Sequence, residues 1–146
     1  MVFVKLTNGF GNNLFQYIAG RLLAEYYDKK IVLCPPFENY YGIVQFEKLN
    51  LEYDGLSKCC NDNKKHVNDQ NYFECFNDKY GDSNFILDGY FENYLYYINN
   101  VEKIKLWFQP VKQRDDNSLI LHLRTGDRLF YSSEYTSYGK PLISIQ

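Results

Sequence analysis

The chain of 146 residues lacks long apolar runs, basic clusters and the spacing of common catalytic motifs. No run reaches the roughly 18 apolar residues that a membrane-spanning helix needs, so we expect no membrane span. There is no Lys- or Arg-rich segment and the formal net charge is −2, which argues against binding to nucleic acid or to an anionic membrane surface. The absence of a Gly-x-Ser-x-Gly motif argues against a serine nucleophile.

Metal-binding patterns are missing as well. The four cysteines, Cys34, Cys59, Cys60 and Cys75, do not have the Cys-x₂₋₄-Cys spacing of zinc sites. No Asp-x-Asp stands in a strand context that would hold Mn²⁺ or Mg²⁺ beside a nucleotide sugar. We therefore expect neither a metal nor another cofactor. Because no signal peptide is visible, we expect the cysteines to be reduced thiols.

Aromatic residues, in contrast, are abundant, with fifteen Tyr and eleven Phe. A genome rich in A and T would raise Tyr, Phe, Asn, Lys and Ile together. A surface that stacks on sugars or bases would also require many rings. The composition favours the first explanation and leaves the second open. A length of 146 residues fits one domain, or one domain and the beginning of another, and 45% hydrophobic residues are enough for a buried core.

The first 34 residues have the pattern of a β–α–β unit. Residues 1–7 are mostly apolar, as in a buried parallel strand, and Asn12 or Asn13 can cap the helix that follows. Residues 31–34 predict a second strand that stops at a Pro-Pro pair. The helix should bury a stripe formed by Leu14, Ile18, Leu22 and Tyr26, widened by Phe15 and Leu23. This pattern predicts an α/β fold with a parallel sheet flanked by helices.

The remainder is less regular. Residues 37–84 predict loops and short elements, with 46–51 either a strand or a helical turn, and residues 85–91 predict a strand. A helix should follow, because Tyr97, Val101, Ile104 and Phe108 recur at helical spacing before Pro110. The polar run 113–117 predicts a linker between a first domain, residues 1–112, and the first strand and loop of a second, residues 118–146.

The stretch TNGFGNNLFQY, residues 7–17, places two glycines at the junction of the first strand and helix. Gly9 and Gly11 allow a tight turn and the close approach of a ligand, and the free N–H groups of a helix start suit a phosphate or another oxyanion. The third glycine of the dinucleotide fingerprint and the Gly-Lys-Ser/Thr of a Walker loop are absent. A structural turn and an anion site therefore remain alternatives.

A second polar stretch, HLRTGD, follows the apolar run that begins at Ser118. Strand alternation places His122 and Arg124 on one face, at the strand end where open α/β sheets bind ligands. Arg presents a planar fork of donors that matches a phosphate. Asp127 is placed to hold either side chain or to cap the next element. A solvated strand end with an ion pair is the alternative, but the desolvation cost beside an apolar strand favours a ligand site.

Three segments in this order resemble the α-1,2-fucosyltransferase family, glycosyltransferase family 11. GFGNNLFQY is similar to the Gly-x-Gly-Asn-Gln-Leu-Phe-Gln-Tyr opening of that family, and LDGYFENYLYY resembles its Gly-Tyr-Phe-Gln-Ser segment. HLRTGD resembles its His-x-Arg-Arg-x-Asp motif. The resemblance extends along the whole chain but covers only the N-terminal half of a typical family member.

The resemblance implies the Rossmann-like N-terminal domain of a GT-B-type glycosyltransferase with the start of its second domain. The implied reaction is an inverting, metal-independent transfer of fucose from GDP-fucose to a galactoside hydroxyl. Arg124 and Asn12 would act at the diphosphate, and Glu134 would be the general base, with Asp127 and Glu92 as weaker candidates. The other implied substrate-binding residues are Gly9, Gly11, His122, Asp127 and Tyr90.

The chain also departs from the family pattern. Thr125 stands in place of the second Arg, Asn13 in place of a Gln, and Glu92-Asn93 in place of Gln-Ser. Three alternatives therefore remain open: an active enzyme, a non-catalytic nucleotide- or glycan-binding remnant, and a decayed reading frame that folds poorly. The expected partners are a GDP-sugar donor and a glycan acceptor. If Met1 is the true start we expect a cytoplasmic protein, with association at a membrane site of glycan assembly left open.

Overall fold

The computed structural model describes residues 1–7, 9–58 and 63–108. The chain divides into two units, Met1–Val111 and Lys112–Gln146, and the described residues belong to the first. The expected linker at 113–117, the strand and loop at 118–146 and the helix stop at Pro110 lie outside the described residues.

The described residues form an α/β unit around a five-stranded sheet, in which every strand pair is parallel. The strand order is β3-β2-β1-β5-β4, so β1 lies at the centre. The strands are β1 (Val2–Lys5), β2 (Ile31–Cys34), β3 (Gly55–Leu56), β4 (Lys65–Val67) and β5 (Phe85–Leu87). The predicted parallel sheet and the initial β–α–β unit are confirmed, and the architecture is compatible with a Rossmann-like domain.

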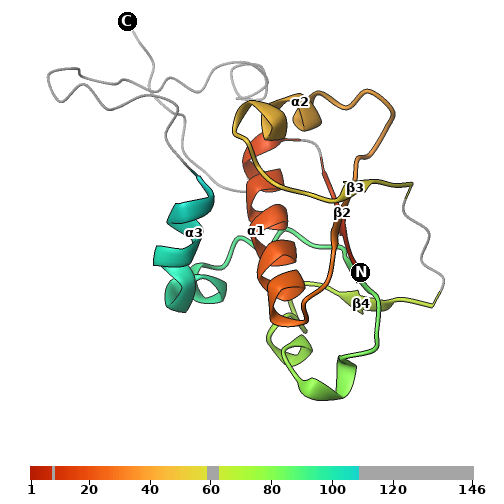
Figure 1. The fold of residues 1–146 in the computed structure, drawn as a ribbon, viewed down its shortest axis with the longest axis vertical. Coiled ribbons are helices and arrows are strands. Elements are labelled where there is room, and N and C mark those ends of the chain that lie inside the picture. The colour runs from red at the N-terminus through yellow and green to blue at the C-terminus, as the bar shows by residue number, and fades with distance from the viewer. Residues whose placement is uncertain (8, 59–62, 109–146) are drawn as a thin grey trace, which may run out of the picture. The chain divides into compact units, whose positions relative to one another are not determined.

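In the described part of the chain three α-helices accompany the sheet: α1 (Phe10–Tyr26), α2 (Tyr41–Lys48) and α3 (Val101–Trp107). In Figure 1, α1 lies between the sheet and α3. The Arg21 guanidinium of α1 lies 4.4 Å from the Trp107 ring centroid, and Lys103 Nζ is 2.8 Å from a Glu25 carboxylate oxygen. Short 3₁₀ turns occur at Phe73–Cys75, Asp78–Tyr80, Tyr94–Tyr96 and Ile98–Asn100.

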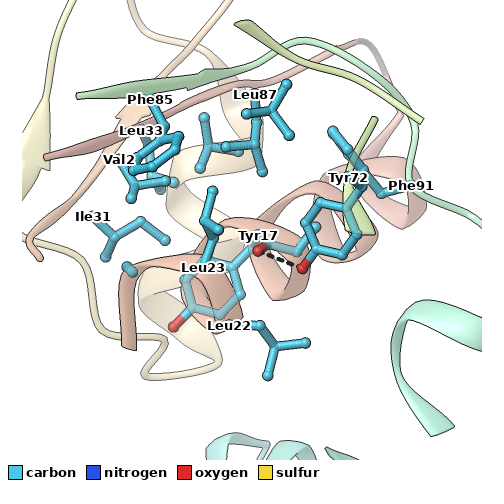
Figure 2. Close-up of a cluster of buried hydrophobic side chains, with 14 of the residues drawn as sticks. Val2, Tyr17, Leu22, Leu23, Ile31, Leu33, Tyr72, Phe85, Leu87 and Phe91 are labelled. Carbon is cyan, nitrogen blue, oxygen red and sulfur yellow. Dashed lines mark hydrogen bonds between the residues drawn. The ribbon is translucent and has the colours of Figure 1, made fainter. Parts of the chain in front are cut away.

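The hydrophobic core fills the space between α1 and the sheet. Figure 2 shows Val2, Leu33 and Phe85 of the sheet above Leu23 of α1, and all four are fully buried. A Cβ added at Gly20 would lie 2.3 Å from Val4 Cγ2, so α1 approaches the central strand closely at this point. Close packing of this kind removes apolar surface from water and is the main stabilising contribution.

The buried face of α1 differs from the predicted stripe. Leu22 and Leu23 are buried as predicted, and Leu14 and Ile18 are partly buried against the core, but Phe15 and Tyr26 are 37% and 48% exposed. The buried residues are Asn13, Gln16, Tyr17, Ala19, Gly20, Leu22, Leu23 and Ala24. Small residues allow the close approach to the sheet, and the two amides are buried because they are hydrogen-bonded. Apolar periodicity therefore located only part of the buried face and missed its polar and small residues.

Other predicted elements are shifted or shortened. Of the two alternatives for 46–51, the helical one is closer, since Phe46 is a buried residue of α2. The strand expected over 85–91 ends at Leu87. The helix expected from Tyr97 begins only at Val101, after two 3₁₀ turns. Asn93 accepts a hydrogen bond from the Leu95 amide at 3.0 Å, and such side-chain bonds compete with helical pairing.

The cysteines do not all match the expectation of reduced thiols. Cys34, at the end of β2, is disulfide-bonded, so the expectation is wrong for this residue. Cys75 is a free and buried thiol, as expected, and Cys59 and Cys60 lie outside the described residues.

Candidate functional site

The candidate site lies at the carboxyl ends of β1 and β5, where the strand order reverses. From β1 the chain passes to β2 on one side, while β5 pairs with β1 on the other. Open parallel sheets bind ligands outside the carboxyl ends of their strands at such a point. Lys5 Nζ lies 2.7 Å from Asp88 Oδ2 and links the two strand ends.

The start of α1 is formed by Gly9 and differs from the prediction. The helix begins at Phe10, so neither Asn12 nor Asn13 is its cap. Gly9 has φ of 101°, a backbone conformation that residues with a Cβ rarely adopt. No side chain of the described residues caps the helix, and its first turn contains no acidic residue. The first turn of α1 therefore supplies no carboxylate to the positive end of the helix dipole.

The two other predicted residues of this junction lie in the first turn of α1. A Cβ added at Gly11 would meet nothing within 4 Å, so this glycine borders open space and is not required by the turn. Asn12 is partly exposed, and its side chain makes no hydrogen bond to the described residues. Asn12 is thus available to a ligand.

Asn13 and Gln16, by contrast, are buried and hydrogen-bonded to the end of β1. The Asn13 side-chain amide donates to the Thr7 carbonyl at 2.8 Å and to Gln16 Oε1 at 3.1 Å. Gln16 Oε1 also accepts from the Thr7 amide at 3.1 Å, and Gln16 Nε2 donates to the Gly89 carbonyl at 2.8 Å. These two side chains fix the chain after β1 relative to the chain after β5.

Two tyrosines connect α2 to the same junction. The buried Tyr40 hydroxyl lies 2.7 Å from both the Thr7 carbonyl and Asn13 Oδ1, and it can donate its proton to one of them at a time. Burial, followed by the neighbouring Tyr41, raises the pKa of Tyr40 to about 12. The Tyr41 hydroxyl accepts a hydrogen bond from the Gly9 amide at 3.2 Å.

Tyr90 follows β5 at the same edge of the sheet. The Asp69 carboxylate accepts hydrogen bonds from the Tyr90 amide at 2.9 Å and from the Phe91 amide at 2.7 Å, and so holds the turn in which Phe91 has φ of 55°. The Tyr90 side chain is 53% exposed. Because Gln16 contacts Gly89, the structure brings Tyr90 and the start of α1 to one edge.

A groove of about 870 Å³ lies next to this junction and was missed by sequence reasoning. It follows the carboxyl ends of β1, β2 and β3, and Tyr40 forms part of its wall. The signal in the sequence is Pro35-Pro36-Phe37, three apolar residues placed directly after a parallel strand, where a ligand edge is expected.

Several predicted site residues cannot be placed relative to this edge. His122, Arg124, Asp127 and Glu134 lie outside the described residues. Glu92 is described and is exposed. Within residues 1–7, 9–58 and 63–108, no group of three or more His, Cys, Asp or Glu side chains could hold a metal ion. In the same residues, no helix has the length and apolar character needed to cross a bilayer.

Comparisons with family models, with curated proteins and with solved structures found no match to this chain. The described edge combines an uncapped helix start, a free carboxamide and an adjacent groove. Chemically, the helix start can accept an oxyanion, and the groove has room for an uncharged part of a ligand.

Proposed function

We propose that the chain is an α-1,2-fucosyltransferase-like glycosyltransferase with a GT-B-type architecture that transfers fucose from GDP-fucose to a galactoside hydroxyl. The observation that carries the proposal is the start of α1: among the described residues no side chain caps it, its first turn has no acidic residue, and the side chain of Asn12 in that turn makes no hydrogen bond. The proposal is also supported by the three segments that resemble this family, because they occur in the same order along the chain.

The chemistry assigned to the residues follows from the charge of the leaving group. In the reaction, an acceptor oxygen attacks C1 of fucose from the face opposite the diphosphate, the bond from C1 to the diphosphate oxygen breaks, and the configuration inverts. Negative charge grows on the diphosphate, so donors aimed at it stabilise the transition state. These donors are the N–H groups at the start of α1, the Asn12 carboxamide and the Arg124 guanidinium. Glu134 takes the proton of the acceptor hydroxyl.

Release of GDP tests this proposal directly. The full chain is incubated with GDP-fucose and a galactoside, with and without EDTA, and free GDP is measured. We expect acceptor-dependent release that EDTA does not change. Arg124→Ala should abolish release, whereas the matched control Arg114→Ala, in the predicted linker, should not. Absence of release with every galactoside tested, or equal activity of the two variants, would contradict the proposal.

The role of Asn12 is tested separately. Asn12→Ala should lower GDP release at least tenfold, as expected for loss of an oxyanion donor. Asn99→Ala, at an exposed position away from the junction, serves as the matched control. Unchanged release by Asn12→Ala would exclude this residue from the site. Binding of GDP or of glycan without any turnover would instead favour the non-catalytic remnant.

A further inference from the structure

The groove beside the α1 start has no role in the chemistry proposed above. Its wall contains Tyr40, whose hydroxyl contacts Thr7 and Asn13, so the groove adjoins the junction. A volume of about 870 Å³ falls within the usual range of small-molecule sites, roughly 300–1,000 Å³.

The lining of the groove is largely apolar. Phe37, Val44 and Leu56 line it with 52%, 48% and 52% of their surfaces exposed. Pro35 and Pro36, also in the lining, have no N–H group to offer to a ligand. Exposed apolar side chains gathered in a concavity favour a ligand with an apolar portion, because burying that portion removes both surfaces from water.

The charges around the groove nearly balance. Lys5 lines it but is paired with Asp88 at 2.7 Å. Lys58 and Glu38, also in the lining, carry opposite charges. An anion such as a nucleotide would gain little from this surface, whereas a neutral ligand would not be opposed by it. The polar side chains in the lining of the groove can form hydrogen bonds with sugar hydroxyls, which both donate and accept them.

We propose that the groove binds the apolar aglycone of a neutral glycoside acceptor, with the sugar directed toward the junction at the start of α1. This inference rests on the proposed function, because it names the part of the acceptor that the glycosyltransferase recognises. Phe37, Val44 and Leu56 contact the aglycone, and the hydroxyl to be glycosylated lies near Asn12.

Calorimetric titration of the full chain with octyl β-galactoside and with methyl β-galactoside, both below micelle-forming concentrations, tests the inference. We expect the octyl compound to bind at least about tenfold more tightly, since each buried methylene adds to affinity. Leu56→Asp and Val44→Asp should each remove this preference. Leu95→Asp, with 47% exposure and a position outside the groove, should keep it. Urea midpoints identify any variant that has lost its fold.

Equal affinity for the two galactosides would overturn the inference, and so would a preference that all three Asp variants lose alike. Loss of GDP binding in Leu56→Asp, with galactoside binding unchanged, would assign the groove to the nucleotide and overturn it too. The two proposals fail separately. Octyl galactoside binding without GDP release refutes only the transferase, and GDP release that is equal for both galactosides and unaffected by Leu56→Asp refutes only the aglycone groove.

Discussion

At the scale of single residues, two neighbouring asparagines in the junction after β1 have different surroundings. Asn13 is completely buried and its amide groups are engaged by Thr7, Gln16 and Tyr40. Asn12, one position earlier, has no such partners for its side chain among the described residues. The alternatives of a structural turn and an anion site are therefore compatible: Asn13 and Gln16 hold the turn, and the proposed function assigns Asn12 to the ligand.

This division predicts different stabilities for two alanine variants. Asn13→Ala should lower the free energy of unfolding by about 1–3 kcal/mol, because the buried groups of Thr7, Gln16 and Tyr40 lose a partner. Asn12→Ala should change it by less than about 0.5 kcal/mol, as is usual for surface positions. Urea denaturation followed by circular dichroism measures both. Equal losses would show that Asn12 also has a structural role.

At the scale of secondary-structure elements, α1 determines the geometry of the site. Its start follows the central strand, its second turn contacts Gly89 after β5 through Gln16, and its middle packs against Val4 at Gly20. The helix is thus fastened at the point where the strand order reverses. The direction of its first N–H groups follows from this packing, so the same contacts that stabilise the helix also aim its dipole at the candidate site.

The two glycines of the junction should respond to alanine in opposite directions. Gly9→Ala should lower the free energy of unfolding by about 1–3 kcal/mol, because φ of 101° strains any residue with a Cβ. Gly11→Ala should leave it unchanged or raise it by up to about 1 kcal/mol, since alanine is the better helix former and the Cβ meets nothing. Thermal or urea unfolding measures the difference. Destabilisation by Gly11→Ala would mean that α1 does not begin as described.

At the scale of the whole molecule, many of the aromatic residues belong to the core. Tyr17, Tyr40, Tyr72, Phe46, Phe85 and Phe91 are among the largest fully buried side chains. Several buried hydroxyls bond to backbone carbonyls: Tyr72 donates to Ala19 at 2.9 Å, and Tyr97 donates to Phe91. A core of this kind requires its phenols to stay protonated. Burial accordingly raises the pKa of Tyr72 and of Tyr97, as it does for Tyr40.

These raised pKa values predict alkaline unfolding. A phenol with a raised pKa contributes its full stability below the pKa of the unfolded chain, near 10, and loses it as pH rises toward the folded value. For Tyr40 the loss falls between about pH 10 and its folded pKa of about 12, at no more than about 1.4 kcal/mol per pH unit. Tyr72 and Tyr97 act in the same direction. Stability should therefore decrease steeply above pH 10.

Urea midpoints between pH 8 and 11.5, with tyrosinate absorbance, measure this dependence. Tyr40→Phe should lower the free energy of unfolding at pH 8, because the substitution removes the hydrogen bonds of the hydroxyl. It should also make the decrease in stability above pH 10 less steep, because the variant lacks this phenol. Tyr94→Phe, at a position that is 68% exposed, serves as the control and should keep the original slope. A stability that does not change up to pH 11.5 would contradict the described burial of these phenols.

The sequence by itself determined the fold class and the place of the turn. Apolar runs at β1, β2 and β5 and a helix between the first two were sufficient for a parallel α/β sheet, because these patterns are local. Gly9 was found for the same reason, since only backbone conformation is involved. The short strands β3 and β4 were not found, because two or three residues carry no periodicity and pair only once the sheet exists.

Only the tertiary structure decided which face of α1 is buried, which asparagine is free and where the groove lies. Asn13 and Gln16 are polar in sequence, yet their burial is stable because Thr7, Tyr40 and Gly89, from three other parts of the chain, supply their hydrogen-bond partners. The groove likewise combines residues that follow three different strands. Burial and concavity depend on contacts between segments distant in sequence, and no local pattern contains them.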